Sequence, residues 1–217
     1  EVRSALPPID LEGVASLRRN QPAIEATLPV PCLVIATDET VRRYIRFGRN
    51  QNDGSPQNDV FIVHPDGRVD PDTPIIWDFE QISGITAHPI DAERLTLSGG
   101  VFTTIANAAE SRYTYYSRGI GIRRSNVLVE GLAHHITGEG DQGAPYGGFI
   151  RITNCANVEV RNTLLTGHKT YQTIGSAGRT VSMGSYDILV NRSVNVAFID
   201  CRQTNDINDR TYWGIMG

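Results

Sequence analysis

The sequence predicts an all-β chain whose second half is a parallel β-helix solenoid, in which short strands stack in successive coils. Two observations carry this prediction. Strand-like segments with an apolar residue at every second position recur through residues 85–217, and three of them follow an asparagine at the same place in the repeat. Glycine, asparagine, threonine and β-branched residues are also plentiful, which is typical of many short strands joined by turns.

Four segments align as copies of one strand. Their first inward column consists of Leu95, Val127, Val158 and Val196. The next inward column lies two residues further on and consists of Leu97, Val129, Val160 and Phe198. A bend then follows at Gly99, Gly131, Asn162 and Asp200. Alternation at a period of two predicts strands whose every second side chain faces a core.

A second strand precedes three of these segments, at residues 120–122, 150–152 and 188–190, and Trp213 and Ile215 begin a fourth copy. The short turn between the two strands holds three asparagines in register, Asn126, Asn157 and Asn195, with a looser column of small residues just before them, Ser125, Cys155 and Ser193. Asparagine also simply favours turns. Three in register instead predict an inward-turned ladder whose buried amides bond the turns above and below.

The spacing of the asparagines, 31 and then 38 residues, exceeds the coil length of roughly 20 to 29 residues in a minimal solenoid. The surplus falls in two insertions, at residues 138–148 and 171–186. Solenoids tolerate such insertions on one face, often the binding face. We expect the two insertions to lie side by side.

Stacked coils of three short strands, an asparagine ladder and long loops beside one sheet resemble the right-handed parallel β-helix of the pectate-lyase-like (pectin-lyase-fold) superfamily. The resemblance covers residues 85–217, which we expect to form the coils and to be incomplete at the C-terminal end. That end would contact another copy or further coils. The superfamily includes polysaccharide lyases, glycoside hydrolases, pectin esterases, phage tailspikes and adhesins, so the fold alone does not define the reaction.

Residues 1–84 lack the repeat and are expected to form an N-terminal cap over an end of the solenoid. A short helix is predicted over residues 11–26 with Asp10 as its N-cap, followed by strands at residues 32–36, 44–47 and 60–63. Turns are expected at Asp53-Gly54 and Asp66-Gly67. Residues 50–59 superficially resemble a calcium loop but lack the spacing of an EF-hand. The sequence therefore identifies no cofactor. Ca²⁺ at this loop is the one candidate ion.

Net charge and composition narrow the classes of partner. The chain carries a net charge of −4 with its Lys and Arg residues scattered, which argues against nucleic acid as the partner. No apolar stretch approaches the roughly 18 to 20 residues of a membrane span. Three cysteines, Cys32, Cys155 and Cys201, form no metal-binding spacing and are expected to be small buried thiols.

The strand after the bend is expected to occupy residues 132–139, 163–170 and 201–208 in successive coils. The resemblance implies that this sheet and its loops form a substrate groove. The catalytic candidates there are His168, Asp206, Glu139 and Lys169. The substrate-binding candidates are Tyr146, Tyr171, Arg179, His135 and Arg210. Register places His168 beside Asp206, whereas His134-His135 should put one ring inside the solenoid and one outside.

These residue types suit two kinds of sugar chemistry. A lyase that acts on uronates needs a cation and a base, for which Lys, Arg and His are present, whereas a hydrolase needs two carboxyl groups. The sequence therefore predicts a secreted, periplasmic or cell-surface protein that acts on a polysaccharide as a lyase or hydrolase. The alternative is a non-catalytic glycan-binding or adhesive solenoid of the tailspike or adhesin type.

Overall fold

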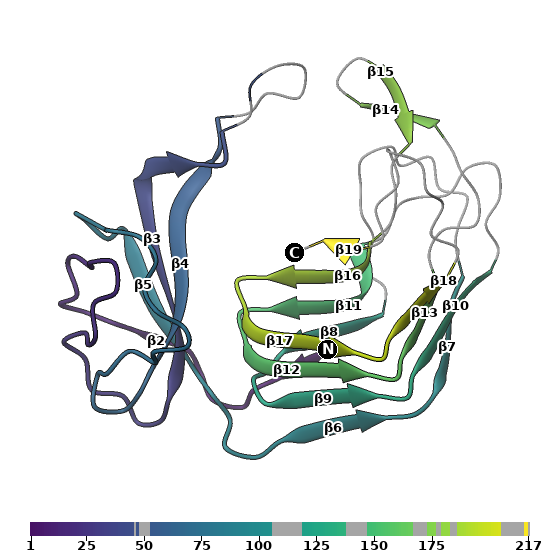
Figure 1. Cartoon of the computed structure of the whole chain (residues 1–217), viewed down its shortest axis with the longest axis horizontal. Coiled ribbons are helices and arrows are strands. Elements are labelled where there is room, and N and C mark those ends of the chain that lie inside the picture. Colours follow the sequence, from purple (N-terminus) through teal and green to yellow (C-terminus); the bar gives the residue numbers. More distant parts are fainter. Residues whose placement is uncertain are drawn as a thin grey trace.

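The computed structural model describes residues 1–45, 47, 53–105, 119–137, 147–166, 173–176, 179–182, 186–204 and 215–216. Over these residues the chain is all-β and contains no helix. Within this part of the chain the strands form three parallel sheets, one antiparallel sheet and one two-stranded hairpin (Figure 1). The prediction of an all-β chain with parallel sheets is confirmed.

The chain runs through the three parallel sheets in turn. The first sheet has the order β1 (Val2–Arg3), β8 (Ile120–Arg123), β11 (Gly147–Thr153), β16 (Tyr186–Asn191) and β19 (Ile215–Met216). The second has β6 (Leu95–Ser98), β9 (Val127–Glu130), β12 (Ala156–Arg161) and β17 (Val194–Ile199). The third has β7 (Val101–Ile105), β10 (Ala133–Thr137), β13 (Leu164–Thr166) and β18 (Arg202–Thr204). Strand β1, far away in sequence, pairs with β8 at the edge of the first sheet.

The predicted columns match the strand register. Val127 pairs with Leu95 on one side and with Val158 on the other, and Val158 pairs in turn with Val196. The column two residues further on pairs in the same way. The second-strand column is confirmed as well, since Ile150 pairs with both Ile120 and Ile188. The fourth copy is shifted by two residues from the predicted alignment, because Ile188 pairs with Ile215 at the place predicted for Trp213. Trp213 itself lies outside the described residues.

The predicted bends are confirmed by backbone geometry. Gly99, Gly131, Asn162 and Asp200 all have positive φ, between 45° and 71°. This left-handed region is most accessible to Gly, Asn and Asp. Backbone hydrogen bonds also link neighbouring bends, because the N–H of Gly131 donates to the carbonyl of Arg161 at 3.1 Å.

The asparagine ladder forms, but it lies on the outside of the turn. The amide of Asn157 donates to Asn126 Oδ1 at 3.1 Å, and the amide of Asn195 donates to Asn157 Oδ1 at 3.1 Å. All three residues have positive φ, between 54° and 59°, and Asn157 is exposed. The prediction of buried, inward-turned amides is therefore wrong. The left-handed backbone turns these side chains outward, where they bond one another, and the amide of Asn126 also donates to the backbone carbonyl of Asp91.

The small-residue column fills the inner side of this turn instead. Ser125 and Cys155 are buried, and Ser125 Oγ accepts the N–H of Ala156 at 3.0 Å. In the same way, Ser193 Oγ from the following turn accepts the N–H of Cys155 at 3.2 Å. A hydroxyl can thus satisfy a backbone group that a fully apolar turn would leave unpaired. Cys32, Cys155 and Cys201 are free thiols, the first two buried and the third partly exposed.

The N-terminal part forms an antiparallel sheet in the order β2 (Ile9–Asp10), β5 (Gly84–Pro89), β3 (Cys32–Arg43) and β4 (Ser55–Val63). The predicted boundary at residue 84 falls at the start of β5, and the first strand of the second sheet begins at Leu95. Gly54 and Gly67 have the positive φ of the expected turns. The strand predicted at residues 44–47 is wrong, because Tyr44 has a φ of 55° and ends β3.

The helix predicted over residues 11–26 is also wrong. Leu17 is fully buried and exchanges backbone hydrogen bonds with Phe79 at 3.0 and 2.9 Å. Gly13 has a φ of 89°, and the ring of Pro22 removes one N–H donor, so both interrupt a helix. The helix-like spacing of apolar residues thus reflects an irregular segment whose apolar side chains pack against the core of this sheet.

The antiparallel sheet packs beside the turns of the parallel stack. Leu33 and Ile62 form one buried cluster with Ala156 and with the partly buried Val194. Figure 1 shows the same arrangement, with β3 and β4 standing next to the turns that lead into β12 and β17. The described contacts therefore place this sheet at the side of the stack rather than over an end.

The last strand of the second sheet is less well covered. Phe198, an inner-column residue of this edge strand β17, is 37% exposed.

Candidate functional site

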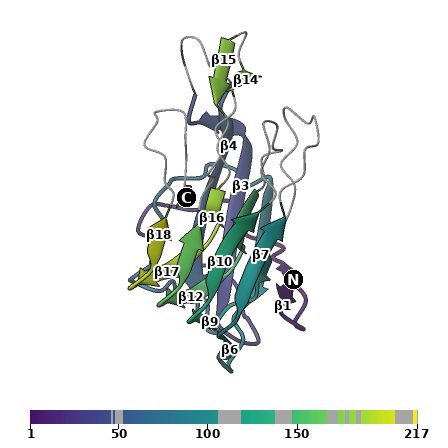
Figure 2. The same cartoon turned by 90° about the vertical axis from the view of Figure 1, so that its right-hand side faces the viewer.

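The third sheet carries the predicted groove. Residues 132–139, 163–170 and 201–208 were assigned to one sheet, and the described strands β10, β13 and β18 confirm this pairing. Figure 2 looks onto this sheet, with β7, β10 and β18 along its face. His135 pairs with Thr103 and is exposed. The sheet therefore presents one of the predicted binding side chains to solvent.

Most of the predicted site lies outside the described residues. His168, Asp206, Glu139, Lys169, Tyr146, Tyr171 and Arg210 are in this group. Arg179 begins β15 (Arg179–Ser182), which pairs with β14 (Thr173–Ser176) in an antiparallel hairpin that the sequence did not predict. The proposed stacking of His168 on Asp206, and the meeting of the two insertions, stay predictions.

The neighbouring histidine points into the core, as the alternation predicted. His134 is fully buried, and its ring stacks on Phe149 with the centroids 4.0 Å apart. Its Nε2 shares a hydrogen bond of 2.8 Å with the hydroxyl of Thr104. Burial, with a smaller contribution from His135, lowers the pKa of His134 to about 4. The ring is therefore a neutral structural group.

A second inner polar contact lies between the first and third sheets. Gln203 of β18 donates from Nε2 to Oδ2 of Asp187 at 2.7 Å, and Asp187 is fully buried on β16. Neither this pair nor the Thr104–His134 pair could be predicted from the sequence pattern. The periodicity marks which positions face inward, but not which inward polar groups find partners.

We expect His134 to make stability depend on pH. Its folded pKa of about 4 lies below the ordinary 6.5, so the unfolded chain gains the proton first as pH falls. The contribution of the neutral His134 ring to the free energy of unfolding is complete above pH 6.5 and is lost as pH falls towards 4. Between pH 7 and pH 5 this group should lower the free energy of unfolding by about 2 kcal/mol. Urea unfolding at both pH values measures it. A His134→Phe variant with the same pH dependence as the parent would contradict the assignment.

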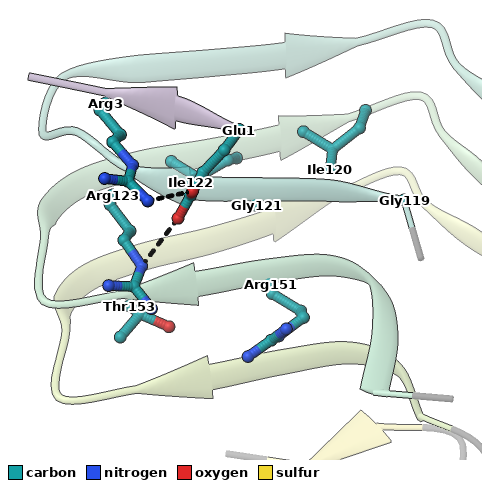
Figure 3. A pocket seen from close by; sticks show the side chains of 9 residues that line it. All are labelled: Glu1, Arg3, Gly119, Ile120, Gly121, Ile122, Arg123, Arg151 and Thr153. Carbon is teal, nitrogen blue, oxygen red and sulfur yellow. Dashed lines mark hydrogen bonds and ion pairs between the residues drawn. The ribbon is translucent and has the colours of Figure 1, made fainter. Parts of the chain in front are cut away.

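A hollow of about 380 Å³ lies on the outer face of the first sheet (Figure 3). It is lined by Glu1, Arg3, Gly119, Ile120, Gly121, Ile122, Arg123, Arg151 and Thr153. Its three arginines come from the adjacent strands β1, β8 and β11. Arg3 pairs with Arg123 in strand register, and Arg151 pairs with Gly121. Parallel pairing thus gathers three cations on one face.

The Glu1 carboxylate lies between two of these cations. Its Oε2 contacts Arg3 Nη2 at 2.5 Å, and its Oε1 contacts Arg123 Nε at 3.0 Å (Figure 3). The hydrogen bond from Arg3, together with the charges of Arg3 and Arg123, holds the pKa of Glu1 below its usual range. The lining residues carry three positive charges and one negative charge, whereas the whole chain has a net charge of −4.

Glycine at two positions shapes the hollow. A Cβ at Gly119 would lie 2.2 Å from the carbonyl oxygen of Phe149, and Gly119 has a φ of 103°, so only glycine allows this close approach. A Cβ at Gly121 would instead meet Glu1 Cγ at 3.4 Å, an ordinary contact. The missing side chain at Gly121 therefore leaves room on the face without being required by the backbone.

The chain matches no protein-family model, no curated protein and no solved structure at a significant level. No helix among the described residues is long and apolar enough to cross a membrane. Within the described ranges, no group of three or more His, Cys, Asp and Glu side chains is placed to hold a metal ion.

Proposed function

We propose that the chain is a right-handed parallel β-helix of the pectate-lyase-like superfamily and that it acts on an extracellular polysaccharide. The coil path supports the fold, since β8, β9 and β10 are followed by β11, β12 and β13 in the same three sheets and in register. The right hand follows from the general handedness of parallel crossover connections. The reaction we propose is that of a polysaccharide lyase or a glycoside hydrolase.

One observation carries the proposed location of the site. From β6 onward, each long connection between the described parallel strands leaves the third sheet and enters the first, at residues 106–119, 138–146, 167–185 and 205–214. Over the same part of the chain, the connections from the first sheet to the second are short, such as residues 124–126. Binding and catalytic residues concentrate on loops held by a rigid scaffold. These connections include all of the catalytic candidates, Glu139, His168, Lys169 and Asp206.

A screen over neutral and acidic polysaccharides tests the proposal. New reducing ends would show cleavage, and ultraviolet absorbance of an unsaturated product would distinguish a lyase from a hydrolase. We expect a His168→Ala variant to lose at least about 100-fold in turnover, as expected for removal of a general acid or base, with an unchanged melting temperature. The control is His64→Ala, because His64 directly follows β4 of the antiparallel sheet, away from the third sheet, and pairs with Asp70. Cleavage of none of the polysaccharides would refute the enzyme proposal, and full activity of His168→Ala would refute the site.

A second candidate is a non-catalytic glycan-binding or adhesive solenoid. It is favoured by the outward-facing positions of the described part of the third sheet, which carry no carboxylate. These are Val101, Thr103, Ile105, Ala133, His135, Thr137, Leu164, Arg202 and Thr204, together with Thr166, which belongs to this face by register but is buried. Retention of a glycan on the folded protein without any cleavage would support this candidate.

A further inference from the structure

The arginine hollow on the first sheet is separate from the proposed groove on the third sheet. Arg3 and Arg123 have side chains 66% and 52% exposed, so their guanidinium groups can reach a ligand from solvent. Arg151 is less exposed and lies at the other side of Gly121. Guanidinium groups are planar donors that match the geometry of a carboxylate.

Glu1 shows which group this geometry accepts. One carboxylate oxygen contacts Arg3 and the other contacts Arg123, so a single carboxylate bridges two strands. Exposed ion pairs of this kind contribute little to stability, because water competes for both partners. A carboxylate from another molecule could therefore replace that of Glu1 at small cost.

A second hollow, of about 300 Å³, adjoins the first and shares Arg3 and Arg123 with it. It extends to Pro8, His88 and Pro89 at the antiparallel sheet. Burial lowers the pKa of His88, so its ring is neutral and can exchange hydrogen bonds with hydroxyl groups. The two arginines thus lie between two hollows whose volumes fall in the range of small-molecule sites, about 300 to 1,000 Å³.

We infer that these two hollows bind a carboxylate-bearing oligosaccharide, with one sugar carboxylate held by Arg3 and Arg123 in the position of the Glu1 carboxylate. Gly121 leaves room for the sugar ring on the same face. The sugar part of this inference rests on the proposed function, whereas the carboxylate part rests on the hollow alone. Glu1 acts as an internal competitor for the site.

Calorimetric titration of the full chain tests this inference with trimers of galacturonate, glucuronate and mannuronate as probes. The methyl ester of each trimer and sodium acetate serve as comparison ligands. Amide shifts of Gly119 and Gly121 in NMR spectra report whether binding occurs at the hollow. We expect at least one free-acid trimer to bind and to shift both amides, while its methyl ester and acetate bind at least about tenfold more weakly.

Four variants locate the binding. Arg123→Ala should weaken it about tenfold, the value of one charged hydrogen bond. Gly121→Leu should block the hollow, and the ordinary contact at its Cβ allows the variant to fold. Glu1→Gln should strengthen binding about threefold by weakening the competitor. Arg94→Ala is the matched control, because Arg94 is 50% exposed, pairs with Glu159 elsewhere and lines neither hollow.

Three results would overturn the inference. These are binding of no trimer, binding of acetate as tight as that of the trimer, and unchanged binding by both Arg123→Ala and Gly121→Leu. The His168→Ala variant separates the hollow from the groove, since it should bind the trimer at the hollow with unchanged shifts of Gly119 and Gly121. Hollow binding without any polysaccharide cleavage would refute the enzyme proposal alone. Cleavage with no binding at the hollow would refute this inference alone.

Discussion

Replacing Phe149 with alanine is expected to lower the free energy of unfolding by about 4 kcal/mol, as for other buried aromatic side chains. Phe149 is 2% exposed and lies on β11 inside the parallel stack. Its ring stacks on that of His134 and also contacts the ring of Phe102. The centroids of the Phe149 and Phe102 rings lie 5.5 Å apart. Truncation would therefore leave a cavity that joins the first and third sheets. Urea unfolding monitored by circular dichroism measures the change.

Phe102→Ala is the matched control for this prediction. It removes a ring from the same aromatic cluster, but Phe102 is 38% exposed on the edge strand β7. Its loss should cost only about 1 to 2 kcal/mol, because less apolar surface is buried there. Equal effects of the two substitutions would mean that Phe149 does not occupy the core between the coils.

Asn157→Leu is expected to destabilise the protein by about 3 kcal/mol. It removes two side-chain hydrogen bonds, to Asn126 and from Asn195, each contributing about 1 kcal/mol. It also forces leucine into a left-handed backbone with a φ of 59°. That strain should add about 1 kcal/mol or more. Urea unfolding of the variant measures the sum.

Asn157→Gly separates the two contributions. Glycine adopts positive φ without strain, so this variant should lose the ladder bonds alone and cost about 1 to 2 kcal/mol. If both variants stay within about 0.5 kcal/mol of the parent, as is usual for surface substitutions, the outer ladder contributes nothing to stability.

The strand register of the second half could be predicted from the sequence because side chains in neighbouring strands of a parallel sheet repeat their environment. Val127, Val158 and Val196 face the same core, so the same residue type recurs in one column. The orientation of the asparagines could not be predicted in this way. Register shows that Asn126 lies above Asn157, but the side of the turn depends on the backbone φ, which the column pattern does not report.

The N-terminal part was harder to predict, because its strands pair over long distances and do not repeat. Residues 11–26 have helix-like apolar spacing, yet Leu17 pairs with Phe79, more than sixty residues further along the chain. The site was also predicted only in part. The arginines are scattered along the sequence, although β1 brings Arg3 to Arg123 across more than a hundred residues. No local pattern marks such a contact.

Methyl NMR provides the most direct test of the stacked-coil arrangement that underlies both the groove and the hollow. In a sample with labelled Val and Leu methyl groups, Val158 should give nuclear Overhauser contacts to Val127 on one side and to Val196 on the other, because these residues pair in register. Adjacent strands lie about 4.8 Å apart, well within range of this measurement. Contacts of Val158 to neither residue would contradict the stacked coils and with them the proposed sites.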